Sequence, residues 1–224
     1  MKTYSLPDIL VDTWVQGGPI NLTDLIGSVV LVEVFQVNCP GCFLYALPKA
    51  IQFHERYKTK DLVVIGLATA FEDYDKNTLE NLERLVQRGE VIGETLHTLT
   101  HQGMVTDGKL DWQLPFPVGM DRVRPDQEPV TPERTLRYTR NALPGFDDLG
   151  EDRKQTVLQQ VRNYLKQKTM KAETFERFAL QGTPSSILFN RKGHAQDVSF
   201  GQRENQESLI EQCLTSRDSL ENDD

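Results

Sequence analysis

Three things are lacking in this sequence of 224 residues: many cysteines, an excess of basic over acidic residues, and long apolar runs. Its three cysteines are an odd number and too few for a secreted scaffold held together by disulfides. The formal net charge of −8 argues against the basic surface that nucleic-acid binding requires. The main apolar run, residues 29–37, contains Glu33 and is too short to span a bilayer. We therefore expect neither a nucleic-acid partner nor a membrane partner.

The beginning of the sequence also lacks the pattern of a secretory signal. Lys2 is followed by Asp8 and Asp12 rather than by an uninterrupted apolar segment. Together with the few cysteines, this predicts a cytoplasmic protein in a reducing compartment, where a disulfide would cycle rather than hold the fold together. The acidic and polar segment 216–224 is expected to be disordered.

What the sequence does contain is a pair of cysteines shortly after its most apolar stretch. Residues 29–35 read VVLVEVF, the nearly continuous β-branched pattern of a strand buried on both faces. Cys39-Pro40-Gly41-Cys42 follows, at the point where this strand is expected to pass into a helix. The free N–H groups and the dipole of a first helical turn favour a thiolate over a thiol. Two cysteines with this spacing are also close enough to form a disulfide.

Strands and helices are predicted to alternate along the rest of the chain. The helix after Cys42 extends to Tyr57 and contains Pro48, which should kink or interrupt it. Strands 29–37 and 62–67 flank this helix, so we expect them to lie parallel, joined by a right-handed crossover. Residues 122–149, rich in proline and charge, are predicted to form a long surface loop. Further strands are expected at 116–120, 185–190 and 196–200, and further helices at 77–88, 91–102, 151–168, 173–180 and 204–214.

Taken together, the sequence resembles the thioredoxin superfamily, and within it the TlpA-like and redoxin branch. The resemblance rests on the CPGC motif after a buried strand and on Gly182-Thr183-Pro184 directly before a later strand. It covers the whole chain except residues 122–171, which we interpret as an insertion into a single domain of residues 1–215. The fold that it implies is α/β, with a central mixed sheet flanked by helices.

The motif departs from the common pattern of this superfamily in three ways. The cysteines enclose Pro-Gly rather than Gly-Pro, and Asn38 rather than tryptophan precedes Cys39. Pro48 also falls one residue later than the usual proline of the following helix. Because the enclosed dipeptide tunes the redox potential, the sequence leaves the direction of the reaction open.

The predicted chemistry is thiol–disulfide exchange. Cys39 is the candidate nucleophile, and Cys42 would resolve the mixed disulfide that Cys39 forms with a substrate. Two inert buried thiols are one alternative. A zinc site completed by His97 and His101 is another, because these histidines would share one face of a helix. The long gap between the two pairs disfavours zinc, so we expect both histidines on a solvated helix face and predict neither a metal nor a cofactor.

The resemblance also implies substrate-binding positions. Pro184 would follow a cis peptide bond and pack across from the cysteines, leaving the backbone of Thr183 free to pair with an incoming peptide. Pro40 and Gly41 would contact the substrate at the same place. The alternative for Pro184 is an ordinary trans proline at the start of a strand.

Glu33 would, by the same resemblance, be the buried acid beneath the cysteine pair. A carboxyl group in apolar surroundings has a raised pKa and can take the proton from Cys42 as that thiol attacks. The alternative is a glutamate whose carboxyl group reaches solvent. Cys213 is expected to be a small buried or half-buried side chain.

The leading functional hypothesis is a thiol–disulfide oxidoreductase that acts on a disulfide-containing protein or a small thiol, with a thiol reductant as second partner. A thiol peroxidase is the alternative enzyme. However, the PxxxTxxC motif of peroxiredoxins would require proline and threonine where this chain has Val32 and Gln36. A redox-inactive binding module with the same fold is the third interpretation.

Overall fold

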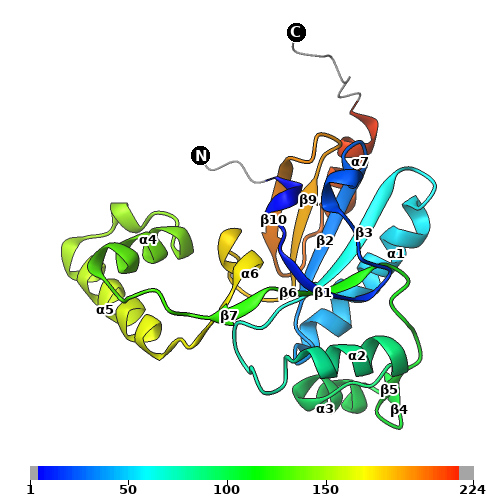
Figure 1. Cartoon of the computed structure of the whole chain (residues 1–224), viewed down its shortest axis with the longest axis horizontal. Helices are drawn as coiled ribbons and strands as arrows, with labels where there is room; N and C mark the ends of the chain where they lie inside the picture. The colour runs from blue at the N-terminus through cyan, green and yellow to red at the C-terminus, as the bar shows by residue number, and fades with distance from the viewer. Residues whose placement is uncertain (1–4, 217–224) are drawn as a thin grey trace.

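The computed structural model describes residues 5–216, so the predicted disorder of residues 217–224 lies outside the described range. A six-stranded sheet forms its centre, with the strand order β1-β6-β3-β2-β9-β10 (Figure 1). The strands are β1 (Val11–Gln16), β2 (Val29–Phe35), β3 (Leu62–Ala68), β6 (Val118–Asp121), β9 (Ser185–Phe189) and β10 (Ala195–Phe200).

The sheet is mixed, which confirms the predicted α/β class. Strands β2, β3 and β6 are parallel to one another, and β2 and β3 are joined through α1 as the sequence predicts. Strand β9 is antiparallel to β2, while β1 and β10 form antiparallel edges. All seven residues of β2 are buried because both faces of the sheet are covered. This explains why the apolar run of β2 does not alternate with polar residues.

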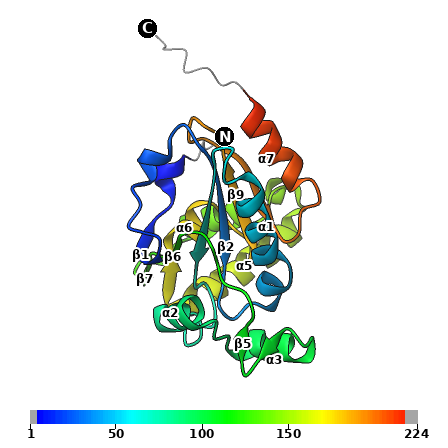
Figure 2. The same cartoon turned by 90° about the vertical axis from the view of Figure 1, so that its right-hand side faces the viewer.

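Different elements cover the two faces of the sheet (Figures 1 and 2). Leu31 and Phe35 of β2 face one core, which is built with α1 (Leu47–Tyr57), α2 (Leu79–Arg88) and α7 (Gln206–Thr215). Val30 and Val32 face the other core, which includes residues of the N-terminal turn and of α6. These covering elements are η1 (Leu6–Asp8), η2 (Leu22–Leu25) and α6 (Glu173–Arg177).

The helix after the cysteines begins irregularly. A π-helical turn, η3 (Cys42–Ala46), changes into α1 just before Pro48. Since proline cannot donate the regular i→i−4 hydrogen bond, a wider turn before it is a physical consequence of its position. The predicted interruption of this helix is therefore observed. Within residues 5–216, no helix combines the length and apolar character needed to cross a bilayer.

The segment after α2 forms a small peripheral unit. Helix α2 ends at Gly89, whose positive φ of 68° gives the left-handed cap that glycine adopts easily. Helix α3 (Gly93–His101) and the short strands β4 (Val105–Thr106) and β5 (Lys109–Leu110) follow. The helices predicted over residues 77–88 and 91–102 are confirmed, with slightly shorter bounds.

The segment between β6 and α6 stands away from the sheet as a separate lobe (Figure 1). Its two ends are held together by β7 (Val123–Pro125), which pairs with β8 (Met170–Ala172). Between them lie α4 (Pro132–Ala142), η4 (Phe146–Asp148) and α5 (Glu151–Gln167), the last close to its predicted range. We call residues 126–168 the α4–α5 lobe.

The prediction of a long surface loop over residues 122–149 is wrong, because this range contains α4. Thr131 caps the helix by accepting a hydrogen bond from the backbone N–H of Arg134 at 3.1 Å. The buried residues of α4 are Arg134, Thr135 and Thr139. A helix that buries polar residues lacks the apolar periodicity from which a helix is recognised.

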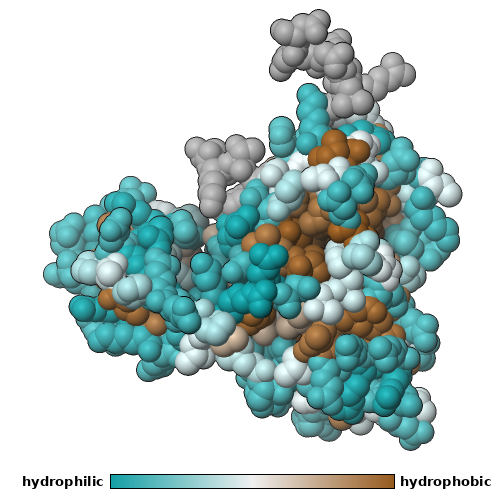
Figure 3. Space-filling model, viewed as in Figure 1, coloured by the Kyte–Doolittle hydropathy of each residue, from teal (hydrophilic) through white to brown (hydrophobic). Residues whose placement is uncertain are grey.

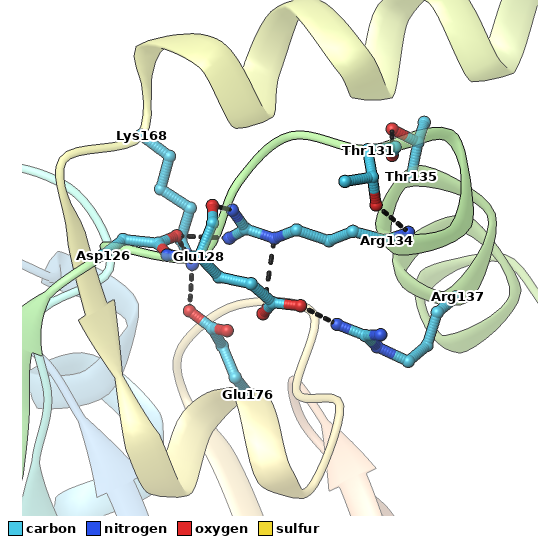
Figure 4. A network of polar contacts seen from close by, with 8 residues as sticks. All are labelled: Asp126, Glu128, Thr131, Arg134, Thr135, Arg137, Lys168 and Glu176. Carbon is cyan, nitrogen blue, oxygen red and sulfur yellow. Dashed lines mark hydrogen bonds and ion pairs between the residues drawn. The ribbon is translucent and has the colours of Figure 1, made fainter.

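A network of ion pairs within the lobe extends through Lys168 to α6 (Figure 4). Asp126, with a side chain only 2% exposed, lies 2.5 Å from the Arg134 guanidinium and 3.3 Å from Lys168 Nζ. Lys168 also pairs with Glu176 of α6, and Arg134 donates to the backbone carbonyl of Glu128. The lobe therefore has a defined position relative to the sheet.

Candidate functional site

The cysteine pair lies where β2 ends and the helical segment begins. Cys39 and Cys42 form a disulfide, with their Cα atoms 5.4 Å apart. Cys42 is completely buried, whereas Cys39 retains 9% exposure. The backbone N–H of Cys42 points at the Cys39 sulfur, with the nitrogen 3.3 Å from it. A donor in this position stabilises negative charge on Cys39, so the accessible sulfur is the one suited to be the nucleophile.

The structure brings the downstream proline to this pair. The Thr183–Pro184 peptide bond is cis, and the carbonyl oxygen of Thr183 lies 3.5 Å from the Cys39 sulfur. A Cβ atom added to Gly41 would be 3.8 Å from Cδ of Pro184, so these residues approach closely. Pro40, Gly41, Thr183 and Pro184 are all partly exposed and surround Cys39.

Sheet topology explains why residues so far apart in sequence meet. Strand β9 runs antiparallel beside β2, with Ser185 paired to Val34. The start of β9 therefore lies at the end of β2, where the cysteine motif follows. Pro184 directly precedes β9, and Gly201 donates its N–H to the Pro184 carbonyl at 2.8 Å. The proline is thus held between β9 and the end of β10.

Glu33, which the resemblance implies to be the acid beneath the cysteine pair, is buried in the central strand. It is 4% exposed and occupies the face of β2 that carries Leu31 and Phe35, the same core in which Cys39 and Cys42 lie. Burial raises the pKa of Glu33 to about 8, although the positive charge of Lys49 opposes part of this shift. A carboxyl group that titrates near neutral pH is suited to proton transfer.

Comparison with solved structures agrees with this geometry. A thiol-disulfide isomerase from Corynebacterium glutamicum is 26% identical, with 92% of this chain and 94% of that one covered and a TM-score of 0.57. A thioredoxin-like superfamily protein is 20% identical, with 94% and 96% covered and a TM-score of 0.55. No family model matches the sequence, and no curated protein matches it. The chain belongs to the thioredoxin superfamily.

Asn38, the residue before the first cysteine of this thioredoxin-superfamily chain, anchors the start of the motif. Asn38 is buried, and its backbone N–H donates to the side-chain oxygen of Asn77 at 2.9 Å. Its side-chain NH₂ donates to Asp73 at 2.7 Å, and its side-chain oxygen accepts from the backbone N–H of Glu94 at 2.8 Å. The last bond caps α3 from a distant part of the chain. Gly93 permits the approach, since a Cβ there would lie 2.3 Å from the Asn38 oxygen.

Sequence reasoning missed this role of Asn38 and two other residues near the motif. Gln36 is buried, accepts a hydrogen bond from the Thr183 hydroxyl at 3.1 Å and donates to the Glu72 carbonyl at 3.3 Å. Lys49 of α1 donates to the carbonyl of Arg203 at 2.8 Å, which holds its charge on the side of the sheet where Glu33 lies. Polar residues within a buried stretch were the available signal for Gln36 and Asn38.

The histidine pair is not assembled with the cysteines. His97 and His101 lie on an exposed face of α3, with their Nε2 atoms 3.2 Å apart, as expected for a solvated face. Among residues 5–216, no group of three or more histidine, cysteine or acidic side chains is placed to hold a metal. Cys213 is half-buried on α7, as predicted.

Proposed function

We propose that this protein is a thiol–disulfide oxidoreductase whose Cys39–Cys42 pair exchanges disulfides with a protein or a small thiol. The observation that carries this proposal is the position of the Cys39 sulfur, 3.5 Å from the carbonyl that precedes the cis proline. The similarity to a structure described as a thiol-disulfide isomerase supports it. Gln36 in place of the peroxiredoxin threonine argues against peroxide chemistry, because its amide is already bonded to Thr183 and Glu72.

In the reducing direction, the Cys39 thiolate attacks one sulfur of the substrate disulfide and releases the other as a thiol. Cys42 then attacks Cys39 in the mixed disulfide and releases the second substrate thiol. Glu33 takes the proton that Cys42 loses, because a carboxyl group with a pKa near 8 is partly ionised at neutral pH. Two electrons pass from the two protein thiols to the substrate disulfide, and the same steps in reverse oxidise a substrate dithiol.

We further propose that the protein belongs to the TlpA-like branch and works in the cytoplasm, where a thiol reductant regenerates the dithiol. The three cysteines in the chain support a disulfide that cycles. A redox potential near thioredoxin's roughly −270 mV would agree with a reductant, whereas one near about −120 mV would indicate an oxidant. Cell fractionation provides the independent test of the location.

The test of the activity is reduction of insulin disulfides and of bis(2-hydroxyethyl) disulfide, with peroxide turnover measured in parallel. Cys39→Ser should abolish both disulfide reactions, because the nucleophile is lost. Cys42→Ser should stop turnover and accumulate a mixed disulfide through Cys39. Cys213→Ser is the matched control and should keep full activity. Peroxide turnover without disulfide exchange would instead identify a peroxidase, and exchange that survives Cys39→Ser would overturn the proposal.

A further inference from the structure

A cleft separates the α4–α5 lobe from the core. Its volume is about 380 Å³, and it lies between one face of α4 and the segment formed by α6 and the residues after it. Tyr138, Asn141 and Ala142 line it on the α4 side. Phe175 and Leu180 border it on the core side with the small exposed part of their side chains, since they are only 7% and 8% exposed. The buried pairs among Asp126, Arg134, Lys168 and Glu176 fix the two sides relative to each other (Figure 4), so the cleft is preformed.

The charges around this cleft are almost balanced. Arg134 and Arg137 of α4 pair with acidic side chains of the lobe, and Arg177 pairs with Asp8. Lys171, which also lines the cleft, has no ion pair among residues 5–216. A carboxylate is therefore the group that would complete the charge pairing of the cleft.

The cleft also lies near the reactive sulfur. Leu180 lines it, and only three residue steps lead from Leu180 to Thr183. Three steps of chain span at most about 11 Å, and the Thr183 carbonyl is 3.5 Å from the Cys39 sulfur. An extended peptide rises roughly 3.3 Å per residue, so about five residues beyond a bound cysteine are enough to enter the cleft.

The surface of the lobe differs from that of the core. In the face shown in Figure 3 the lobe is largely hydrophilic, whereas apolar residues gather over the N-terminal elements of the core. Within the cleft, the exposed edges of Phe175 and Leu180 lie among polar and charged lining residues such as Lys171. Such a combination suits a segment that carries both an apolar and an acidic side chain.

We propose that the cleft binds an extended segment of a protein substrate, with an acidic side chain against Lys171 and an apolar one against the exposed edges of Phe175 and Leu180. This rests on the proposed oxidoreductase function and makes the substrate a protein rather than a small thiol. The short stretch of chain between Leu180, which lines the cleft, and Thr183, which contacts Cys39, favours a peptide over a separate small ligand.

The test uses the full chain, reduced beforehand, and peptides whose single cysteine is joined to 2-mercaptoethanol by a disulfide. Each reaction converts the protein dithiol to its disulfide and yields the free peptide and 2-mercaptoethanol, so electrons and atoms balance. One peptide carries Asp and Leu four to six residues from its cysteine, a second carries Lys in place of Asp, and a third has no such arm. The concentration of peptide that gives half the maximal rate is compared between variants.

Lys171→Glu should raise this concentration about tenfold for the Asp peptide, lower it for the Lys peptide and leave the armless peptide unchanged. Ala142→Trp, at the exposed end of α4, should weaken both armed peptides by filling the cleft. Lys166→Glu, on an exposed part of α5 outside the cleft, is the matched control and should change none of them.

Two results would overturn the docking proposal. One is an equal response of the three peptides to Lys171→Glu and Ala142→Trp. The other is a weakening of the Asp peptide by Lys166→Glu as large as that by Lys171→Glu. Failure of the underlying function is distinguishable, because the wild type would then not react even with bis(2-hydroxyethyl) disulfide.

Discussion

Two buried carboxyl groups in this molecule have pKa values that are shifted in opposite directions. Glu33 in the central sheet is 4% exposed, and the pKa of its side chain is raised to about 8 because burial outweighs the charge of Lys49. The side chain of Asp126 in the lobe is 2% exposed. Burial acts to raise its pKa too, but the hydrogen bond from Arg134 and the charge of Lys168 prevail and lower it.

The difference shows what a buried acid is used for. A carboxyl group without an adjacent cation keeps its proton until near neutral pH and can give it up during chemistry. A carboxyl group with two cations in contact stays ionised and acts as a structural link. In this protein the first type lies on the face of β2 whose core also contains the cysteines. The second joins Arg134 to Lys168 within the α4–α5 lobe, and Lys168 in turn pairs with Glu176 of α6.

The largest expected effect comes from Glu33→Gln, which replaces the titrating acid with a neutral group of similar shape. Since the folded-state pKa of Glu33 lies above the unfolded value of 4.5, its stabilisation is complete below 4.5 and is lost as pH rises through about 8. Above pH 8 the variant should exceed the wild type in free energy of unfolding by roughly 3–5 kcal/mol. Urea unfolding of the oxidised proteins between pH 5 and 9 measures this.

The exposed Glu80→Gln on α2 is the control and should follow the wild type at every pH. Glu33→Gln should also slow the attack of Cys42 on a mixed disulfide. If the free energies of unfolding of Glu33→Gln and the wild type followed parallel curves between pH 5 and 9, Glu33 would be ionised in the folded protein. The contrast between the pKa shifts of Glu33 and Asp126 would then be wrong.

The second prediction tests the ion pairs of Asp126. Arg134→Ala removes one of the two cations from Asp126 and should destabilise the lobe locally by about 3–5 kcal/mol. Hydrogen exchange should show faster exchange in α4 and α5 and unchanged exchange in β2 and β3. Because the folded pKa of Asp126 is depressed, the link is present above its ordinary value of 3.8 and is lost as pH falls through the lower folded value.

Arg137→Ala is the matched control for Arg134→Ala. It breaks an exposed pair with Glu128, so less than about 1 kcal/mol is expected. Equal effects of the two variants would mean that burial of the pair contributes nothing, and equal loss of protection in β2 would mean that lobe and sheet unfold together.

The smallest of the three effects on stability concerns Asn38, the neutral buried residue that directly precedes Cys39. Asn38→Ala leaves Asp73 and the N–H of Glu94 without their partner and should lower the free energy of unfolding by about 1–3 kcal/mol. It should also change the exchange rate at Cys39, because the loop before the motif loses its anchor. Asn21→Ala, an exposed cap of η2, should have the smaller effect on stability and none on exchange. An unchanged rate in Asn38→Ala would limit Asn38 to stabilising the fold.

The sequence was sufficient for those parts of the structure that local patterns determine. The nearly continuous apolar run, with only Glu33 within it, predicted β2, and the Thr183-Pro184 pair before a strand predicted the start of β9. The meeting of Cys39 with Thr183 followed from the family resemblance, and the strand order explains it. Lys49 was not predicted because its effect on Glu33 arises only when α1 packs on the sheet.

The lobe shows where sequence reasoning failed. Helix α4 was missed because its inward-facing residues are Arg134, Thr135 and Thr139, which a periodicity of apolar residues cannot detect. Thr131 followed by Pro132 was a usable start signal for a helix, but it stood among other prolines and charges. Pairing of Asp126 with Lys168, 42 positions later, depends on the folded lobe and leaves no local signature.

The exposed segment between α4 and α5 includes Leu143. A cut there would leave Cys39 and Cys42 in the N-terminal portion of the chain and Pro184 in the C-terminal portion. Neither polypeptide alone would possess a complete reactive centre. Two separately expressed halves, cut at that turn, should therefore be inert apart and recover exchange only after β9 of one inserts beside β2 of the other. The architecture thus lends itself to a split reporter of association between two fused partners.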